Sequence, residues 1–217
     1  MTTDQLRRAI LTLHFKPGQH LVERDLCLEL GVSRTSIREA LRHLEAEGFI
    51  ERQATRGVIV ASVNRDEARQ IYEVRLAIEP EMAKHFAERA SDADIADLEA
   101  AAQRIGRASR SRRPADAALA YDAFYGAIMR GAQNDIAGRL LQTLRGRMAW
   151  LRAVTSIRAP DARRGDTITL VQEIVAAAKA RDGELMAERC RAFVLRSAAF
   201  ADSVLAEEEA AGASAIA

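Results

Sequence analysis

The chain has 217 residues, of which 48% are apolar and 29% charged, and its 32 basic and 31 acidic side chains leave a formal net charge of +1. This composition excludes a disordered or fibrous protein, while the near-zero charge neither indicates nor excludes a nucleic-acid partner. No apolar stretch reaches the roughly 18–20 residues of a membrane span, and the first residues lack the apolar core of a signal peptide, so we expect a cytoplasmic protein without a membrane partner.

The N-terminal part of the sequence predicts three helices followed by a two-stranded hairpin. Apolar residues at helical spacing define a first helix that stops at a Pro-Gly turn. A short second helix is predicted over residues 23–30, and a third begins at the N-cap Ser33. The β-prone runs 49–52 and 58–60 are joined by a loop and form a wing. This order predicts a winged helix-turn-helix domain over residues 1–63.

The rest of the chain carries helical patterns. Asn64 and Glu67 form a capping box before a long apolar stripe, in which Pro80 is expected to introduce a kink. Further helices are predicted from Ser91 to a basic loop at residues 107–113, and over residues 115–130, 134–153, 162–181 and 183–206. We therefore expect a mainly α-helical protein with an antiparallel bundle of about six helices over residues 64–206 and a disordered tail over 207–217.

Three arginines on the third predicted helix indicate a DNA-recognition surface. Arg34, Arg38 and Arg42 recur every four residues and fall within about 80° of the helix circumference, with Thr35 beside them. A guanidinium can hold phosphate oxygens or the guanine edge with two hydrogen bonds, and the free N–H groups from Ser33 to Ser36 favour a phosphate. The competing interpretation is a solvated surface helix whose arginines pair with Glu39 or Glu45. The preceding short helix and the following wing favour DNA binding.

The segment LVERDLCLELGVSRTSIREALRHLEAEGFIERQATRGVIV resembles the winged helix-turn-helix of GntR-type bacterial transcription regulators. YEVRLAIEPEMAKHFAERA resembles the first helix of the effector-binding bundle of the FadR subfamily, the FCD domain. The resemblance extends from about Leu6 to about Arg196 and implies a DNA-binding regulator. Carried over by motif position, it implies operator contacts from Arg24, Ser33, Arg34, Thr35, Arg38, Arg56 and Gly57.

Bundles of this family often hold a divalent metal on one Asp and three His, and here the resemblance fails. The corresponding positions are Tyr121, Tyr125, Val171 and Phe193, none of which is an ordinary ligand for Zn, Ni or Mn. Asp122 is one residue out of register, and His85 is the only histidine of the bundle. We therefore expect no metal and no cofactor.

Two interpretations of these four positions remain open. Either these side chains line a cavity for an effector, or they fill the space of the missing metal site as part of the hydrophobic core. Arg75 stands where the family tends to keep an arginine facing the cavity, and a buried guanidinium without a metal favours an anion, which points to a carboxylate-bearing organic acid. The competing explanation for Arg75 is an internal salt bridge to Glu79 or Glu173.

The sequence contains no catalytic motif, so an enzyme is not expected. Cys27 and Cys190 form no disulfide or zinc pattern and are expected to be small buried hydrophobic residues. The sequence therefore predicts a ligand-responsive regulator that binds a palindromic operator on double-stranded DNA as a homodimer. The alternatives are a constitutive repressor or architectural protein whose bundle only dimerises and, third, a helical enzyme with a DNA-binding head.

Overall fold

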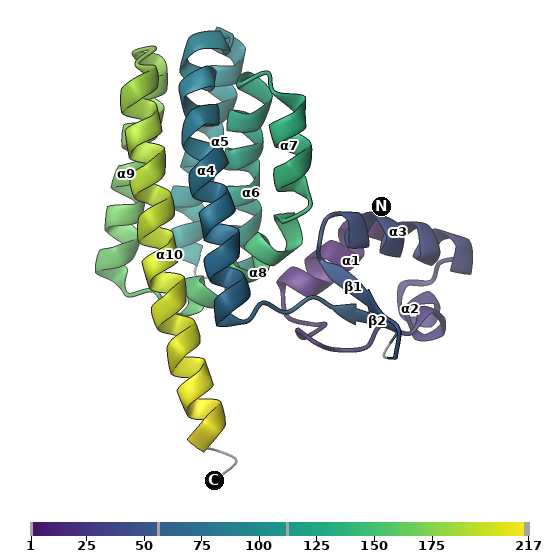
Figure 1. Ribbon diagram of the computed structural model, residues 1–217. Helices are drawn as coiled ribbons and strands as arrows, with labels where there is room; N and C mark the ends of the chain where they lie inside the picture. The colour runs from purple at the N-terminus through teal and green to yellow at the C-terminus, as the bar shows by residue number, and fades with distance from the viewer. Residues whose placement is uncertain (1, 56, 112, 215–217) are drawn as a thin grey trace.

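The computed structural model describes residues 2–55, 57–111 and 113–214. Within these residues the chain forms an N-terminal head, residues 2–63, and a helical bundle, residues 64–214 (Figure 1). The predicted fold class, mainly α-helical with one small β-hairpin, is confirmed. None of the helices in the described ranges combines the length and the apolar character that a membrane span requires.

The head consists of three helices and a two-stranded antiparallel sheet in the predicted order. Ile50 pairs with Val60 across the sheet. The apolar faces of the helices and the hairpin close over one core, in which Leu6, Ile37 and Leu44 are fully buried. This is the winged helix-turn-helix arrangement. Its elements are α1 (Thr2–Leu11), α2 (Glu23–Leu30), α3 (Arg34–Ala46), β1 (Ile50–Gln53) and β2 (Gly57–Val60).

The turn between α2 and α3 is short because Gly31 ends α2 and Ser33, only two residues later, caps the start of α3. Gly31 has a φ of 65°, a left-handed conformation that glycine adopts without a Cβ clash, and its N–H donates to the Cys27 carbonyl at 3.0 Å. The Ser33 hydroxyl accepts a hydrogen bond from the Ser36 N–H at 3.2 Å, as an N-cap does. The first turn of α3 therefore starts at Arg34.

The bundle contains seven helices in the described part of the chain, one more than the sequence predicts. Its central core includes Phe86, Phe124 and Ile128, all fully buried. The first and last helices, α4 and α10, lie side by side, and α4 continues through Pro80 (Figure 1). The helices are α4 (Arg65–Arg89), α5 (Asp92–Ser111), α6 (Pro114–Gly131), α7 (Asp135–Gln142), α8 (Arg145–Arg158), α9 (Asp161–Lys179) and α10 (Gly183–Ser214).

The additional helix arises because the predicted helix over residues 134–153 is divided into α7 and α8. The division falls at Thr143 and Leu144, where the sequence has neither glycine nor proline. Directly after it, the backbone N–H of Gly146 donates to the Glu47 carbonyl of the head at 2.7 Å. The chain changes direction here because α8 begins against the head. No local sequence signal predicts this contact.

Two helices also extend further than predicted. The predicted basic loop is helical as far as Ser111, because α5 buries Ala108 against the bundle. The predicted disordered tail is helical as far as Ser214: α10 buries Leu205, and Arg158 pairs with Glu207 and Glu208 at 3.4 and 3.2 Å. Both corrections come from packing against other helices, which outweighs local composition.

The head is packed directly against α6 and α8 of the bundle. Ala118 and Ala149, one from each helix, belong to the hydrophobic core of the head. Arg145 pairs with Glu47 at 3.5 Å and with Asp122 of α6. Gly146 lies so close to the head that a Cβ atom there would be 2.2 Å from the backbone nitrogen of Phe49. At Gly146, the bundle therefore approaches the head so closely that no side chain would fit between them.

Candidate functional site

The exposed face of α3 presents the three predicted arginines. Arg34, Arg38 and Arg42 are all exposed, as is Thr35 between the first two. The opposite side of the helix is buried in the core of the head through Ile37, Ala40, Leu41 and Leu44. The bundle touches the head near the other end of this segment, at Glu47 and Gly48, so the N-terminal turns of α3 stay open to solvent.

The ion pairs on this face differ from those considered in the sequence. Arg38 pairs with Glu23 of α2 at 2.9 Å rather than with Glu39 or Glu45. In the described ranges, Arg34 and Arg42 form no ion pair. An exposed pair such as Arg38–Glu23 is worth about 0–1 kcal/mol and exchanges readily for a phosphate partner. All three guanidiniums are therefore accessible to an anionic surface.

The remaining predicted DNA contacts come from the start of α3, from α2 and from the wing. Ser33 is exposed at its N-terminus, Ser36 is partly buried, and Arg24 is exposed and paired with its neighbour Asp25 at 3.0 Å. Gly57 has a φ of 67° and open space around it at the tip of the wing. Arg56, the other predicted contact of the wing, lies outside the described residues.

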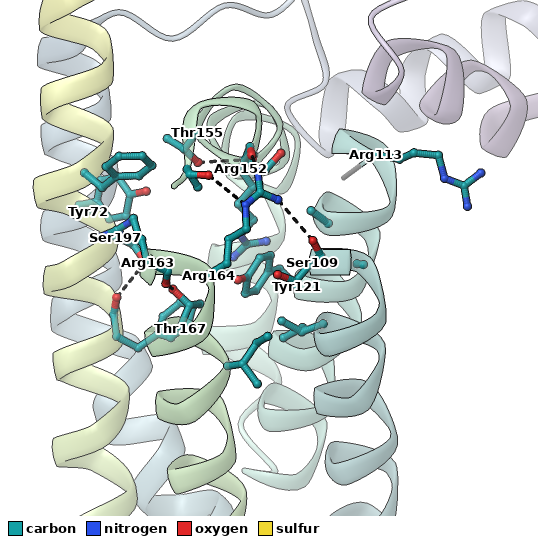
Figure 2. Close-up of a pocket in the computed structure, with 18 of the residues that line it drawn as sticks. Tyr72, Ser109, Arg113, Tyr121, Arg152, Thr155, Arg163, Arg164, Thr167 and Ser197 are labelled. Atoms are coloured by element: carbon teal, nitrogen blue, oxygen red, sulfur yellow. Dashed lines mark hydrogen bonds between the residues drawn. The ribbon is translucent and has the colours of Figure 1, made fainter. Parts of the chain in front are cut away.

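The bundle contains a partly open pocket of about 100 Å³ that residues of six of its helices line (Figure 2). Apolar groups from Ile105, Ile168, Phe193 and Phe200 form part of its wall. Among its described lining residues there are five arginines and no acidic side chain. The arginines are Arg75, Arg113, Arg152, Arg163 and Arg164. The pocket is therefore a cationic site with an apolar lining.

Arg75 is neutralised inside the protein. Its Nε and Nη2 donate to the two carboxylate oxygens of Glu79 at 2.7 and 3.0 Å, and Nη2 also donates to the Tyr125 hydroxyl at 2.8 Å. Burial lowers the pKa of Arg75, but Glu79 and Tyr125 outweigh this effect and raise the pKa above its ordinary value. Of the two salt bridges considered for Arg75, the structure contains the one to Glu79; Glu173 lies next to Arg189, at 3.4 Å.

Arg152 is a pocket residue that the sequence analysis missed. Its guanidinium carbon lies 5.5 and 4.9 Å from the ring centroids of Tyr121 and Tyr125. Its Nη2 is shielded from solvent and has no hydrogen-bond partner in the described part of the chain. Burial and the positive charge of Arg75 lower the pKa of Arg152. The sequence does contain a signal for Arg152: it lies four residues after Met148 and therefore on the same face of the helix, where a charged side chain is rarely buried.

The four predicted cavity residues divide between the two interpretations. Tyr121 and Phe193 line the pocket together with Arg75. Tyr125 is buried and borders a second, more open hollow of about 520 Å³, which Arg152 also lines. Val171 is fully buried in the central core and lines neither space. The core-filling interpretation therefore describes Val171, whereas Tyr121 and Phe193 face a cavity.

The residues at the positions where the resemblance implies metal ligands do not fit a metal ion. Burial raises the pKa of Tyr121 to about 12 and that of Tyr125 well above its usual value, so both phenols stay protonated. The cation of Arg152 lies against both rings. Within the described ranges, no three His, Cys, Asp or Glu side chains are grouped as metal ligands would be, and His85 contacts Glu81 at 3.2 Å.

The two cysteines are free, as expected. Cys190 is buried, and burial raises the pKa of its thiol; Cys27 is only partly buried.

A winged helix-turn-helix head with an exposed arginine-bearing helix, followed by a helical bundle with a pocket, is an arrangement typical of transcriptional regulators. The model of the bacterial regulatory proteins of the gntR family matches residues 1–60, and the FCD domain model matches residues 70–196. The chain therefore belongs to the GntR family, in the group that carries an FCD domain. Its domains and relatives are those of regulators, not of enzymes.

Curated relatives agree with this assignment. The chain is 35% identical to the Nta operon transcriptional regulator of Aminobacter aminovorans, over 41% of this chain and 42% of that protein. It is 33% identical to the galactonate operon transcriptional repressor of Escherichia coli, over 46% of this chain and 56% of the repressor. The matches thus span about half the length of these relatives.

Solved structures show the same fold. Escherichia coli McbR/YncC superposes with a TM-score of 0.76 at 21% identity, covering 96% of each chain. A GntR regulator from Rhodococcus sp. RHA1 gives a TM-score of 0.74 at 22% identity, covering 91% of this chain and 93% of that one.

Proposed function

We propose that this regulator binds a palindromic operator as a homodimer and that a small carboxylate-bearing molecule in the bundle pocket changes its affinity for DNA. The observation that supports DNA recognition most directly is the exposed face of α3 with Arg34, Arg38 and Arg42. Two copies related by a two-fold axis would place two such helices in successive major grooves, which is why the operator is expected to be palindromic.

The head offers groups that could fix it on the DNA backbone and groups that could recognise the bases. The free N–H groups at the start of α3, next to Ser33, are suited to a DNA phosphate, which would fix the helix against the backbone. Arg34 follows directly and is unpaired in the described structure, so its planar fork is free to bind the O6 and N7 atoms of a guanine. We expect Arg24 of α2 and Gly57 at the wing tip to add further contacts to the DNA.

The composition of the bundle pocket supports an anionic effector. No acidic side chain is among its described lining residues, and two of its five arginines, Arg152 and Arg163, are bound to no carboxylate in the described part of the chain. This composition favours a carboxylate over a cationic or neutral molecule. Helix α8 lines this pocket through Arg152 and contacts the head through Gly146. An effector that binds more tightly to one arrangement of α8 would therefore shift the arrangement of the heads.

Substituting one recognition arginine tests the DNA-binding proposal. For Arg34→Ala we expect affinity for the operator to fall by about 1–3 kcal/mol, with specificity relaxed at one base pair, because a bidentate contact is lost. The measurement is a footprint and a mobility-shift titration at the protein's own promoter, at fixed salt. Arg104→Ala, which removes an exposed arginine of α5, is the matched control. Equal affinity in both variants would remove Arg34 from the interface.

The same titration tests the quaternary and regulatory parts of the proposal. A homodimer on a palindrome predicts one protected site with two half-sites and a dimer mass in sedimentation. Protection of a single half-site by a monomer would contradict the symmetric arrangement. DNA binding that no carboxylate changes would favour the alternative of a constitutive DNA-binding protein.

A further inference from the structure

We propose that Arg152 is the cation of the bundle pocket that binds an effector, and that the effector is a small aromatic or alkyl carboxylate. This inference rests on the proposed function, because it specifies the receptor and the ligand class of the same effector site. It differs from the sequence expectation, which assigned the anion to Arg75. Three observations on the pocket support it.

The first observation is the position of the guanidinium. The guanidinium of Arg152 lies against the rings of both Tyr121 and Tyr125. The ring of Phe193 lies 5.8 Å from that of Tyr121 and 6.0 Å from that of Tyr125. Two phenol rings therefore lie against an organic cation, and the ring of Phe193 adjoins both of them. A guanidinium presents two parallel N–H donors to a carboxylate.

The second observation is that the other arginines of the pocket already have partners. Arg75 is bound to Glu79, and Arg113 is bound to Asp116 at 2.8 Å and points away from the pocket in Figure 2. Arg164 donates to the carbonyls of Ser156 and Ala159 at 2.8 and 2.9 Å. Arg163 donates to the Arg196 carbonyl at 2.7 Å and lies 4.0 Å from the ring centroid of Phe200.

Arg152 is different from these four. Its Nη2 is buried and has no hydrogen-bond partner among the described residues. Arg75 and Arg152 both lie against the ring of Tyr125, at 5.1 and 4.9 Å, but the nearby carboxylate, Glu79, is bound to Arg75 by two hydrogen bonds. A buried cationic donor without a partner is unfavourable. Because Nη2 itself has almost no exposed surface, a ligand carboxylate in the pocket would satisfy it after the guanidinium turns toward the pocket.

The third observation concerns the size and lining of the pocket. Because about 10–15 Å³ of such space holds one water, a pocket of about 100 Å³ has room for on the order of ten non-hydrogen atoms. Apolar groups of Ile105, Ile168 and Phe200 face this space, beside the ring of Tyr121. An anion with an aromatic ring or a short alkyl chain matches this wall, whereas inorganic phosphate leaves it without a partner.

The test compares two substitutions of arginine by methionine on the same helix. Arg152→Met removes the charge from the pocket, and Arg158→Met removes an exposed arginine of α8 that lies outside the pocket lining. Arg152→Lys is a second pocket variant that keeps the charge but loses the fork. Calorimetric titration uses benzoate and hexanoate as probes, with benzamide and inorganic phosphate as uncharged and inorganic counterparts. Circular dichroism and operator binding are measured on each variant.

We expect benzoate or hexanoate, but neither benzamide nor phosphate, to bind the wild type and Arg158→Met. Affinity for the carboxylate should fall at least about tenfold in Arg152→Met and less in Arg152→Lys. Equal carboxylate binding by all variants would exclude Arg152 as the receptor, and binding of benzamide or phosphate would exclude the ligand class. Absence of binding to the wild type would also overturn the inference.

Operator binding by the same samples separates these results from a failure of the proposed function, which would appear as loss of DNA binding. If Arg152→Met does not fold, the comparison of Arg152→Lys with Arg158→Met decides.

Discussion

The head carries its arginines on an exposed helix face, whereas the bundle turns several of its arginines inward. Arg34 and Arg42 of the head are solvated and, in the described chain, form no ion pair, so their charge costs the fold little. Arg75 of the bundle is buried, and the Nη2 atom of the half-buried Arg152 is shielded from solvent, so each depends on a partner. The same side chain serves a surface for a polyanion in one region and a binding pocket in the other.

The role of burial in this difference is most directly tested by two Arg–Glu pairs at the same spacing on α4, one buried and one exposed. Arg75–Glu79 has side chains that are only 3% and 1% exposed, whereas those of Arg69–Glu73 are 58% and 59% exposed. For Glu79→Gln we expect the free energy of unfolding to fall by about 3–5 kcal/mol, because a buried guanidinium loses its counter-charge. Urea denaturation measures the change.

Glu73→Gln is the matched control and should change the free energy of unfolding by no more than about 0.5 kcal/mol. Similar losses in the two variants would mean that burial does not distinguish the pairs, and burial would then not explain the contrast between the two regions.

The contact between the two regions gives a second, smaller effect. In Gly146→Ala the new Cβ would lie 2.2 Å from the backbone nitrogen of Phe49 and 2.3 Å from the backbone carbon of Gly48. Because neither is a flexible side chain, we expect a loss of about 1–3 kcal/mol and weaker packing of the head on α8. Fluorescence of Trp150, on the same helix, follows unfolding in urea.

Gly165→Ala in α9 is the control, because a Cβ there meets no other atom within 4 Å. It should be neutral or stabilising by up to about 1 kcal/mol, since alanine favours the helix. A loss of the same size in both variants would contradict the close approach at Gly146.

The smallest effect concerns how the head begins its recognition helix. Ser33→Ala removes the acceptor of the Ser36 N–H, and we expect the protein to lose about 1 kcal/mol of stability. Thermal unfolding detects this loss, and Ser33→Asp should restore most of it because a carboxylate also caps a helix. If Ser33→Ala melts like the wild type, the cap does not stabilise α3.

The head was largely predictable because its signals are local. Gly31, the cap at Ser33 and the four-residue spacing of Arg34, Arg38 and Arg42 act within one or two helical turns, and the structure places each as predicted. Even here, the partner of Arg38 was not predictable, because Glu23 comes from another helix and meets it only through the packing of α2 on α3.

The bundle shows what the amino-acid sequence alone determined and what the tertiary structure decided. Helical periodicity was sufficient for most of its helices, and residue identity at four positions argued against a metal, because protein metals need donor atoms that Tyr121, Tyr125, Val171 and Phe193 do not supply in this setting. The break between α7 and α8 and the partners of Arg75 and Arg152 depend on which helices lie together. Burial, and with it the energy of a charge, is a property of that packing rather than of any short segment.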